Sequence, residues 1–479
     1  MLNDYIMYTL NSVSVWKVHE GVEDMAKEIE PLTSGSIWRR MLSFAFPLFL
    51  GNLFQQMYNT IDSLIVGNFV GSSALAAVSS SGNLIFMLIG FFSGISSGAG
   101  AIVSRFFGAK DEENLRKTVH TTVAFGLVAG VVITLVGFFF SPQILIWMDT
   151  PESVMPESVA YLKIYFAGAM GLVMYNIFVG ILQAVGDSRH PLYYLIVCSL
   201  VNLVLDLVFI AIFHAGVEGA ALATVIAQVV SAGLCLLQLT TTKENYRLQI
   251  KNIRFTPSIL RMIIRVGFPS GIQGSIISFA NVVVQANVNA FGEMAMAGYG
   301  AYSKVEGFVF LPINSFTMAL TTFVGQNLGA EKYDRIRKGT RFGILVSILL
   351  AELIGILVFL FAPQMIAAFG SSPEVVQFGI EKARTAALFY FLLAYSHSIS
   401  AILCGAGKTM VPMMVMLAFW CILRVAFLTI TIPLTHSIQM VYWVYPLTWA
   451  CSSAAFFIYY RKAEWMCRAG VGMTHQVKN

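Results

Sequence analysis

The chain has 479 residues, of which 57% are hydrophobic and 11% charged, and its mean hydropathy is +0.74. Soluble domains carry about 25% charged residues, so this composition excludes an ordinary soluble protein and indicates a polytopic membrane protein. The net charge of +5 does not indicate nucleic-acid binding, because the basic residues lie in short segments between apolar runs.

Apolar runs of about 20 or more residues recur along the chain, and each can cross a hydrocarbon core of roughly 30 Å as a helix. A backbone in lipid must satisfy its own hydrogen bonds, so continuous apolar runs favour helices over the alternating strands of a barrel. The pattern therefore predicts an all-α protein with twelve transmembrane helices, at about residues 41–66, 75–104, 118–141, 159–185, 191–213, 216–240, 262–292, 298–325, 340–362, 380–405, 410–432 and 438–460.

These spans divide the chain into an N-terminal cytoplasmic tail (1–40), an N-lobe (41–240), a cytoplasmic linker (241–261), a C-lobe (262–460) and a C-terminal cytoplasmic tail (461–479). The first segment lacks the uninterrupted apolar core of a secretory signal peptide. Met25 is an alternative start, so residues 1–24 are either translated or an upstream artefact. The six cysteines form no CxxC pair and are interpreted as small apolar residues, not as a disulfide or metal framework.

The distribution of charge predicts the orientation of the chain. With both termini in the cytoplasm, 25 of the 30 Lys and Arg lie in or beside cytoplasmic segments. Lys163, Lys382 and Arg384 are assigned to outside segments, and Lys304 and Arg424 fall within spans. This bias follows the positive-inside rule, so the span count and the orientation support each other.

Two halves of the chain repeat each other. The phrase SRFFGAKDEENLRK at 104–117 recurs as GQNLGAEKYDRIRK at 325–338, and ILQAVGDSRHP at 181–191 recurs as ILCGAGKTMVP at 402–412. Six helices separate the copies, so both halves insert the same way up and are related by an axis along the membrane normal. We interpret the first pair of phrases as cytoplasmic loops that orient and gate each lobe, not as a ligand site.

Proline landmarks also repeat, since Pro47 in the first span recurs as Pro269 in the seventh, and Pro312 lies in the eighth. We expect kinks there, which transmembrane helices tolerate when neighbouring groups satisfy the freed backbone. Two six-helix lobes with kinked helices predict a machine in which one lobe rocks against the other around a central cavity. A channel is disfavoured, because the sequence has neither a carbonyl-filter signature nor an Arg ladder.

Four acids lie within predicted spans, and each is costly if it faces lipid, so each is paired, interfacial or beside a wet cavity. They are Asp62, Asp206, Glu306 and Glu352. Polar side chains lie on one face of each of three spans. In the first span these are Asn52, Gln55, Gln56, Asn59, Asp62 and Ser63; in the fifth, Asn202 and Asp206; in the seventh, Ser278, Asn281, Gln285 and Asn289. The amides either join helices or line the cavity.

The repeat distinguishes the two aspartates from the rest of these polar residues. Asp62 aligns with Val284 and Asp206 with Phe427, so neither acid has a counterpart in the C-lobe. A constraint of the fold should occur in both copies, so an acid pair in one copy points to function. Two nearby carboxylates in a low-dielectric cavity favour binding a proton or a cation such as Na⁺, and either can couple to a gradient.

The other charged residues in the spans leave alternatives open. Lys304 and Glu306 lie two residues apart in AYSKVEGF, so structural pairing and a role in the C-lobe cavity are both consistent with the sequence. Glu352 and Arg424 have no partner that the sequence identifies. His397 is interpreted as a buried polar contact between helices, and no HExxH motif indicates an intramembrane enzyme.

At this point the chain resembles the multidrug and toxic compound extrusion (MATE) antiporters. The resemblance covers about residues 38–460 and depends on a combination of segments: FPLFLGNLFQQMYNTIDSLIVGNFVG, GAKDEENLRK, LQAVGDSRHP, NLVLD and VGQNLGAEKYDRIRK. It implies twelve helices in two V-shaped lobes, and export of amphipathic organic cations driven by inward H⁺ or Na⁺. Some branches carry a Glu in span 7, where this chain has FPSGIQGSIISFAN, so it looks more like the DinF-like branch.

The resemblance places the coupling site at Asp62 and Asp206, with Asn202 and Asn59 beside them. Gln55, Asn281, Gln285, Lys304 and Glu306 are expected in the substrate cavity, and Pro47 and Pro269 at kinks. The protein is then a monomeric secondary transporter of the bacterial plasma membrane, with no cofactor beyond H⁺ or Na⁺. The alternative is a flippase for lipid-linked oligosaccharides or peptidoglycan precursors. Such a protein should line its cavity with several Arg or Lys, whereas the spans hold two bases against four acids.

Overall fold

The computed structural model describes residues 31–466, except residues 70, 71, 149, 151, 153, 370, 371 and 464. Side chains are also outside the description at residues 59, 61–81, 83, 86 and 211. The described part consists of helices joined by turns and short irregular segments, and it contains no β-strand. The expectation about residues 1–24 therefore lies outside the described residues.

The helices fall into two consecutive sets of six spans. The first set comprises α3 (Ile37–Phe69), α4 (Ser72–Gly108), α5 (Glu112–Trp147), α6 (Met155–Ala167), α7 (Ala169–Val185), α8 (Arg189–Asp206), the π-helix η1 (Leu207–Ile212) and α9 (Gly216–Thr241). The second comprises α10 (Pro257–Asn289), α11 (Glu293–Gly329), α12 (Tyr333–Ala367), α13 (Pro373–Ala387), α14 (Tyr390–Gly405), α15 (Met410–Met416), the π-helix η3 (Leu417–Leu423), α16 (Arg424–Thr435) and α17 (Gln439–Lys462). The short 3₁₀-helix η2 (Ile250–Asn252) lies between the sets.

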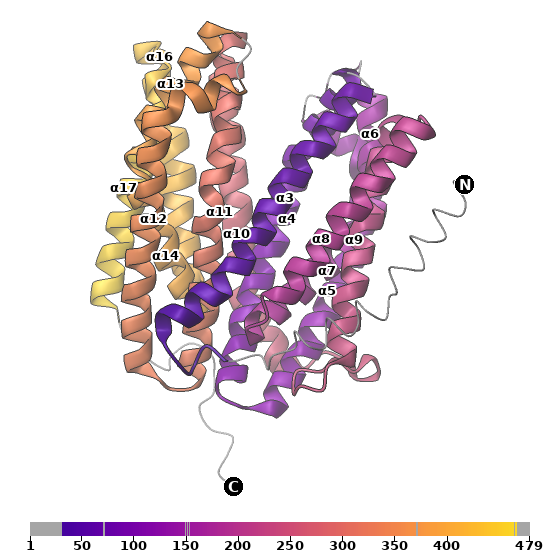
Figure 1. Ribbon diagram of the computed structural model, residues 1–479, viewed down its shortest axis with the longest axis vertical. Helices are drawn as coiled ribbons and strands as arrows, with labels where there is room; N and C mark the ends of the chain where they lie inside the picture. The colour runs from indigo at the N-terminus through magenta and orange to yellow at the C-terminus, as the bar shows by residue number, and fades with distance from the viewer. Residues whose placement is uncertain are drawn as a thin grey trace, which may run out of the picture.

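The helices confirm the predicted all-α fold. Among the described residues, eight helices are long and apolar enough to cross a membrane, and two bent pairs, α6–α7 and α13–α14, each make one more span. The remaining two, α3 and α10, are 33 residues each, about 50 Å at 1.5 Å per residue. Polar side chains along these two helices lower their hydropathy, and both run along the bundle beside the others (Figure 1).

The sequence repeat is visible in the backbone. Lys110 and Glu331, at equivalent places in the doubled phrase, both adopt a left-handed φ of +55°. At the opposite end of the helices, His214 and His436 do the same, at +52° and +48°. The bends agree as well, 48° between α6 and α7 and 57° between α13 and α14. Left-handed backbone is uncommon for residues other than glycine, so its recurrence at matched positions supports a duplicated fold.

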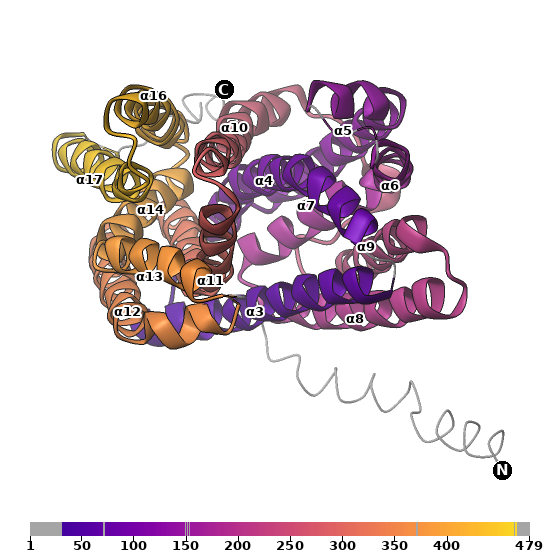
Figure 2. The same cartoon turned by 90° about the horizontal axis from the view of Figure 1, so that it is seen from above.

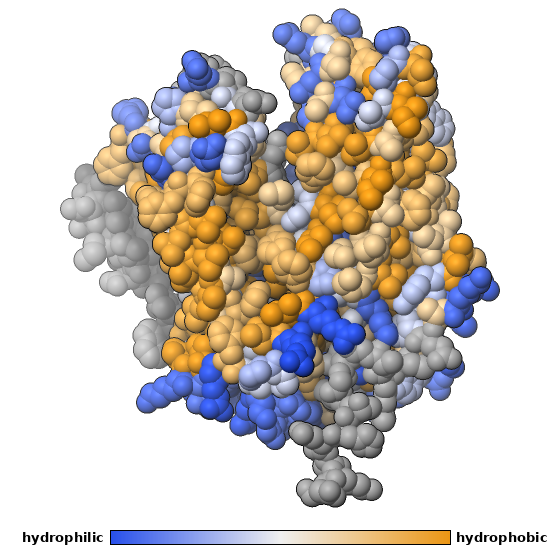
Figure 3. Space-filling model, turned by 180° about the vertical axis from the view of Figure 1, so that it is seen from behind, coloured by the Kyte–Doolittle hydropathy of each residue, from blue (hydrophilic) through white to orange (hydrophobic). Residues whose placement is uncertain are grey.

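The two lobes form a V (Figure 1). They meet at the end that carries the turns at residues 109–111, 186–188, 242–256, 330–332 and 406–409, which we call the basic end. They diverge toward the other end, called here the far end, where the space-filling surface has a notch between them (Figure 3). Viewed from above, α3 and α10 lie between the outer helices of the two lobes (Figure 2).

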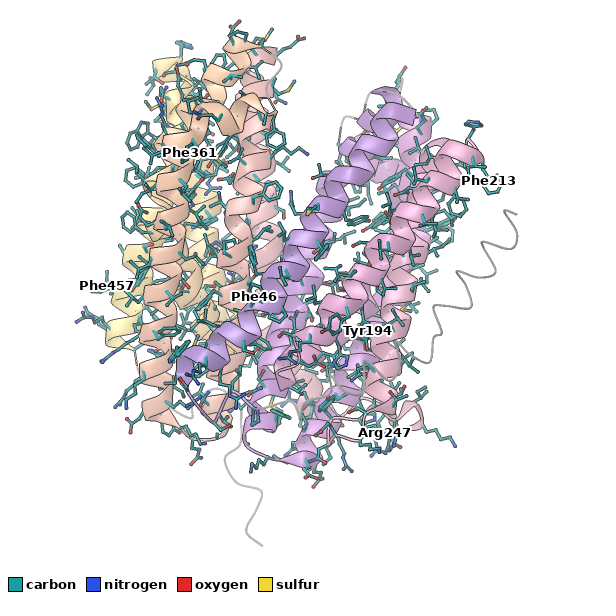
Figure 4. The ribbon with its side chains drawn as sticks, viewed as in Figure 1. Phe46, Tyr194, Phe213, Arg247, Phe361 and Phe457 are labelled. Atoms are coloured by element: carbon teal, nitrogen blue, oxygen red, sulfur yellow. The ribbon has the colours of Figure 1, made fainter. Side chains whose placement is uncertain are left out.

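Large apolar side chains cover the outer surface of the bundle. Phe213, Phe361 and Phe457 are about half exposed or more and point away from the helices in Figure 4. In Figure 3 the hydrophobic residues, coloured orange, form a continuous band between hydrophilic ends. Exposed apolar surface on this scale marks contact with lipid, since soluble monomers rarely expose such large apolar patches. The chain is therefore a multi-pass membrane protein.

The first helix of each repeat crosses between the lobes. At the basic end, Met41, Phe44 and Leu48 of α3 belong to the buried core of the second set of helices. Conversely, Ile259 and Ile263 of α10 belong to a core of the first set. The two lobes are thus joined by an exchange of helix ends, in addition to the linker.

Close glycine contacts secure α10 against α4. A Cβ added at Gly94 would lie 2.2 Å from the Ser270 carbonyl oxygen, and one at Gly98 would lie 2.6 Å from the Gly267 Cα. Small residues spaced by four let transmembrane helices approach closely. This pair is therefore a rigid support for the cavity between the lobes.

Candidate functional site

The doubled phrase of the sequence forms the contact that closes the basic end. Gly108 lies so close to the second lobe that an added Cβ would be 1.9 Å from the carbonyl oxygen of Gln326. Gly329, its equivalent in the repeat, stands in the same relation to the carbonyl oxygen of Arg105, also at 1.9 Å. Arg105 and Gln326 are themselves equivalent positions, so the contact is reciprocal, as in an isologous interface.

Hydrogen bonds cross the same contact. The Gln326 amide donates from Nε2 to the carbonyl oxygen of Ala184 in the first lobe, at 3.0 Å. Its Oε1 accepts from the backbone N–H of Leu32, at 2.9 Å. The Ser104 hydroxyl donates to the same Ala184 carbonyl, at 3.0 Å. Gln326 is fully buried, so one side chain joins both lobes and the segment that precedes α3.

That segment is held to the second lobe by Arg335 of α12. The guanidinium donates to the carbonyl oxygens of Leu32, Ser34 and Gly35, at distances from 2.6 to 3.1 Å. Lys332 adds a bond from Nζ to the carbonyl oxygen of Thr33, at 2.8 Å. Charge-assisted hydrogen bonds are stronger than neutral ones, so residues 32–35 are firmly tied to this lobe.

A cavity of about 500 Å³ lies between the lobes, on the side of this closed contact that faces the far end. Its walls come from α3, α4, α7, α8 and α9 of the first lobe and α10, α11 and α14 of the second. The lining is rich in neutral hydrogen-bonding side chains: Asn52, Gln55, Asn176, Gln183, Gln228, Gln273, Asn314, Thr317 and Ser400. Among the described residues, the lining contains no Asp, Glu, Lys or Arg, and His397 is its one histidine.

The cavity lies on the pseudo-symmetry axis, because many of its walls are equivalent positions 221 residues apart. Asn52 pairs in this way with Gln273, and Asn176 with His397. Asn52 donates to Ser315 at 3.1 Å, and Gln273 donates to Ser400 at 3.0 Å. Two of the lining amides are thus fixed in orientation by hydroxyls of the second lobe. A volume of this size suits a drug-sized molecule.

The predicted ion site is built around Asp206 at the end of α8. Asp206 and Asn202 are both fully buried, one turn apart. With its amide oriented to satisfy both neighbours, Asn202 donates from nitrogen to Asp206 Oδ2 at 2.8 Å and accepts from the backbone N–H of Thr224 at 3.2 Å. The π-helix η1 begins directly after Asp206. Short π-helical segments often occur at functional sites because they redirect a side chain.

The structure brings the backbone of α3 beside this carboxylate, since α3 packs along α8 and contacts η1. The side chains of Asp62 and Asn59, the other two predicted members of the site, lie outside the described residues. Pro47 and Pro269 lie inside α3 and α10, and Pro47 lines the cavity.

The residues predicted for the substrate cavity are dispersed. Gln55 lines it, whereas Asn281 accepts from Arg424 at 3.4 Å. Gln285 donates to Asn289 at 2.8 Å on an exposed face of α10. Lys304 is exposed on α11, and Glu306, partly buried, accepts from the Tyr302 hydroxyl at 3.0 Å.

The structure gives defined positions to three charged residues for which the sequence indicates no role. Lys382, assigned to an outside segment, is fully buried in α13, because the bent pair α13–α14 begins its span at Pro373 and not near residue 380. Arg424, fully buried, donates to Thr448 of α17 at 3.1 Å. Glu352 accepts from the backbone N–H of Phe391, beside the same bend, at 3.3 Å. These partners come from other helices, so no local pattern could indicate them.

The described part of the chain has neither a disulfide nor a group of metal ligands. The five described cysteines are free thiols. No group of three or more His, Cys, Asp or Glu side chains there could hold a metal ion.

Known proteins resemble this chain over most of its length. A family model described as MatE matches twice, at residues 47–208 and 269–430, which repeats the spacing of the two halves. Two Bacillus subtilis proteins are similar: the probable multidrug resistance protein YoeA, 31% identical over 89% of this chain and 94% of its own, and YpnP, 28% identical over 90% and 97%.

A solved structure described as the outward-facing conformation of a multidrug resistance MATE family transporter of the MOP superfamily matches with a TM-score of 0.84. It is 23% identical, over 90% of this chain and 96% of its own, so this likeness concerns the fold. Members of the family are transporters and not enzymes, and they need no cofactor. The duplicated match and the YoeA relative show that this chain belongs to the MATE family, as a multidrug efflux transporter of the membrane.

Proposed function

We propose that the protein exports amphipathic organic cations in exchange for H⁺ or Na⁺, with the basic end in the cytoplasm. The observation that carries the proposal is the buried Asn202–Asp206 pair, which the first lobe has and the second lacks. Twenty-five of the 30 Lys and Arg lie toward the basic end or in the tails. The positive-inside rule therefore supports the orientation, and the V then faces outward.

The proposed cycle starts in the outward-open state. An ion enters from the far end and binds at Asp206. Asn202 contributes its amide oxygen or its N–H group, and Asp62 lies on the neighbouring helix. A neutralised carboxylate no longer repels nearby carbonyl oxygens and is less costly to remove from water, so α3 can pack against α8 in a different arrangement. Pro47 provides a flexible point within α3, because it has no N–H for the helix ladder. The movement narrows the cavity and releases the substrate outward.

The neutral lining supports a division of roles between substrate and ion. Amide and hydroxyl oxygens can orient the polar part of a drug and stabilise a diffuse positive charge without binding it tightly. Asp206 is not among the residues that line this cavity, so the proposed substrate site and the proposed ion site are separate. The part of the lining that the structure describes holds no Lys or Arg, which also disfavours the alternative flippase, whose pyrophosphate cargo needs several cations.

The test is transport of a fluorescent cationic dye by the purified protein in proteoliposomes, under an imposed pH gradient or an imposed Na⁺ gradient. We expect uphill dye transport with one of the two gradients, and slower transport of an anionic dye of similar size. If neither gradient drives uphill dye transport, the antiport mechanism is contradicted. Preference for the anionic dye would contradict the assignment of substrate. The DinF-like branch assignment does not decide between the ions, and this measurement does.

A further inference from the structure

Lys382 occupies an unusual position for a cation. It lies on α13 in the far half of the second lobe, is fully buried, and does not line the cavity between the lobes. Its ammonium group has no hydrogen-bond acceptor within reach among the described residues. A buried ammonium without an acceptor strongly destabilises the folded protein unless its surroundings stabilise the charge.

Aromatic rings surround this ammonium group. Nζ lies 3.2 Å from the ring centroid of Tyr445, and 5.5, 5.8 and 5.9 Å from those of Tyr302, Tyr299 and Tyr442. Two of the rings come from α11 and two from α17. A cation within about 6 Å of a ring centroid is attracted by the ring quadrupole, and the attraction is stronger when both are desolvated. We call these four residues the tyrosine cage.

Hydrogen bonds between hydroxyls fix the cage. Tyr299 and Tyr445 share one at 2.5 Å, which joins α11 to α17. Tyr302 shares another with Tyr390 of α14, at 2.8 Å. The rings therefore hold their orientation in the absence of any outside ligand. Such preorganisation is typical of aromatic sites that bind ammonium ligands, because little order is left to impose on binding.

A carboxylate stands beside the cage. Glu306 accepts from the Tyr302 hydroxyl at 3.0 Å, so its carboxylate lies against one ring of the cage. Arg424 is the other cation of this region, and it is already engaged by Asn281, Thr448 and the ring of Tyr445, 4.6 Å away. Four rings and one carboxylate are the chemistry that recognises an alkylammonium ion, and the lysine presents just that group.

We infer that the tyrosine cage and Glu306 form an ammonium receptor in the second lobe, and that the chain's own Lys382 is its permanent occupant. The first lobe has an acid site that can exchange its ion, whereas the second carries its cation covalently. Removal of the lysine head group should therefore create a site for a small primary ammonium ion. This inference does not depend on which ion drives transport.

The test is chemical rescue of thermal stability in the full-length protein in detergent. We expect Lys382→Ala to lower the unfolding temperature, and millimolar n-propylammonium to restore it. The uncharged 1-propanol, of similar size, should not. Wild-type protein and Lys304→Ala, which loses an exposed lysine of the same lobe, should not respond to propylammonium. In Lys382→Ala/Tyr445→Leu, the concentration for half-maximal rescue should rise at least about tenfold, since the closest ring is lost.

Equal effects of propylammonium and propanol, or equal stabilisation of the wild type, would overturn the inference. If Lys382→Ala does not fold, the volume-conserving Lys382→Met replaces it in a double-mutant cycle with Glu306→Gln. The receptor predicts that Glu306→Gln destabilises the wild type but is harmless or stabilising in Lys382→Met, because the unpaired carboxylate is removed. Additive effects of the two substitutions would contradict it.

Discussion

Substitution of the two glycines at the basic end should open the protein toward that side. In Gly108→Ala or Gly329→Ala, the new Cβ would lie 1.9 Å from a backbone carbonyl oxygen of the opposite lobe. Real contacts of this kind lie beyond about 3 Å, and a backbone oxygen cannot rotate away as a side chain can. The lobes must therefore separate locally by about 1 Å or more. Overpacking of this kind costs typically 1–3 kcal/mol.

That cost applies only to the state in which the basic end is closed. A destabilisation of 1–3 kcal/mol changes the ratio of closed to open protein by roughly 5- to 150-fold. Cys404 provides a native reporter of the opening, because its thiol lines the cavity, close to the Ser97 and Ser270 hydroxyls. We expect a membrane-impermeant maleimide, added from the basic side, to modify Cys404 faster in both variants, as followed by peptide mass spectrometry.

Matched controls come from glycines in open space. An added Cβ at Gly233 or Gly300 meets nothing within 4 Å, so Gly233→Ala and Gly300→Ala should leave the rate of Cys404 modification unchanged. The reciprocal geometry also requires Gly108→Ala and Gly329→Ala to act in the same direction. Unchanged modification of Cys404 in both variants, with folded protein, would refute the role assigned to the doubled phrase.

Three further predictions follow from the contacts around the basic end. Gln326→Ala removes the hydrogen bonds to Ala184 and Leu32 and should also speed Cys404 modification from the basic side. A modification rate equal to that of the wild type would show that this side chain does not hold the basic end closed. Arg335→Ala should expose the segment at residues 32–35 to limited proteolysis, because the carbonyl groups of that segment lose their guanidinium donor. The control is Arg337→Ala, which removes an exposed side chain from the same helix. Burial raises the pKa of the Tyr246 phenol in the linker above its ordinary value of 10.0, so only the unfolded chain ionises there. Stability should therefore fall above about pH 10. Tyr246→Phe should reduce that fall, as measured by thermal unfolding at pH 8 and pH 11.

The fold could be predicted largely because its signals are local and repeated. Hydropathy located the spans, and the recurrence of the doubled phrase indicated two copies of one six-helix unit. The same phrase predicts loops that orient and gate each lobe, but its spacing cannot show that Gly108 and Gly329 pack reciprocally across the lobes. That contact depends on the arrangement of the two copies, which no single copy encodes.

The candidate site was predictable only in part, for the same reason. Asn202 and Asp206 are one turn apart on one helix, so their contact follows from helical periodicity. Lys382 was assigned to an outside segment because a cation near the end of an apolar run usually lies at the interface. Its stabilisation by rings of α11 and α17 requires the packing of three helices. Arg424 likewise depends on Asn281 and Thr448, which are distant in sequence.

The measurement that tests the central claim most directly compares two modes of transport in Asp206→Asn. Asparagine keeps the size of the side chain and its ability to bond with Asn202, but it cannot bind a proton or provide a charge for Na⁺. In proteoliposomes, the variant should retain exchange of labelled for unlabelled dye across the membrane, while uphill dye transport driven by the H⁺ or Na⁺ gradient falls to background. Gradient-driven transport at the wild-type level in Asp206→Asn would contradict the account.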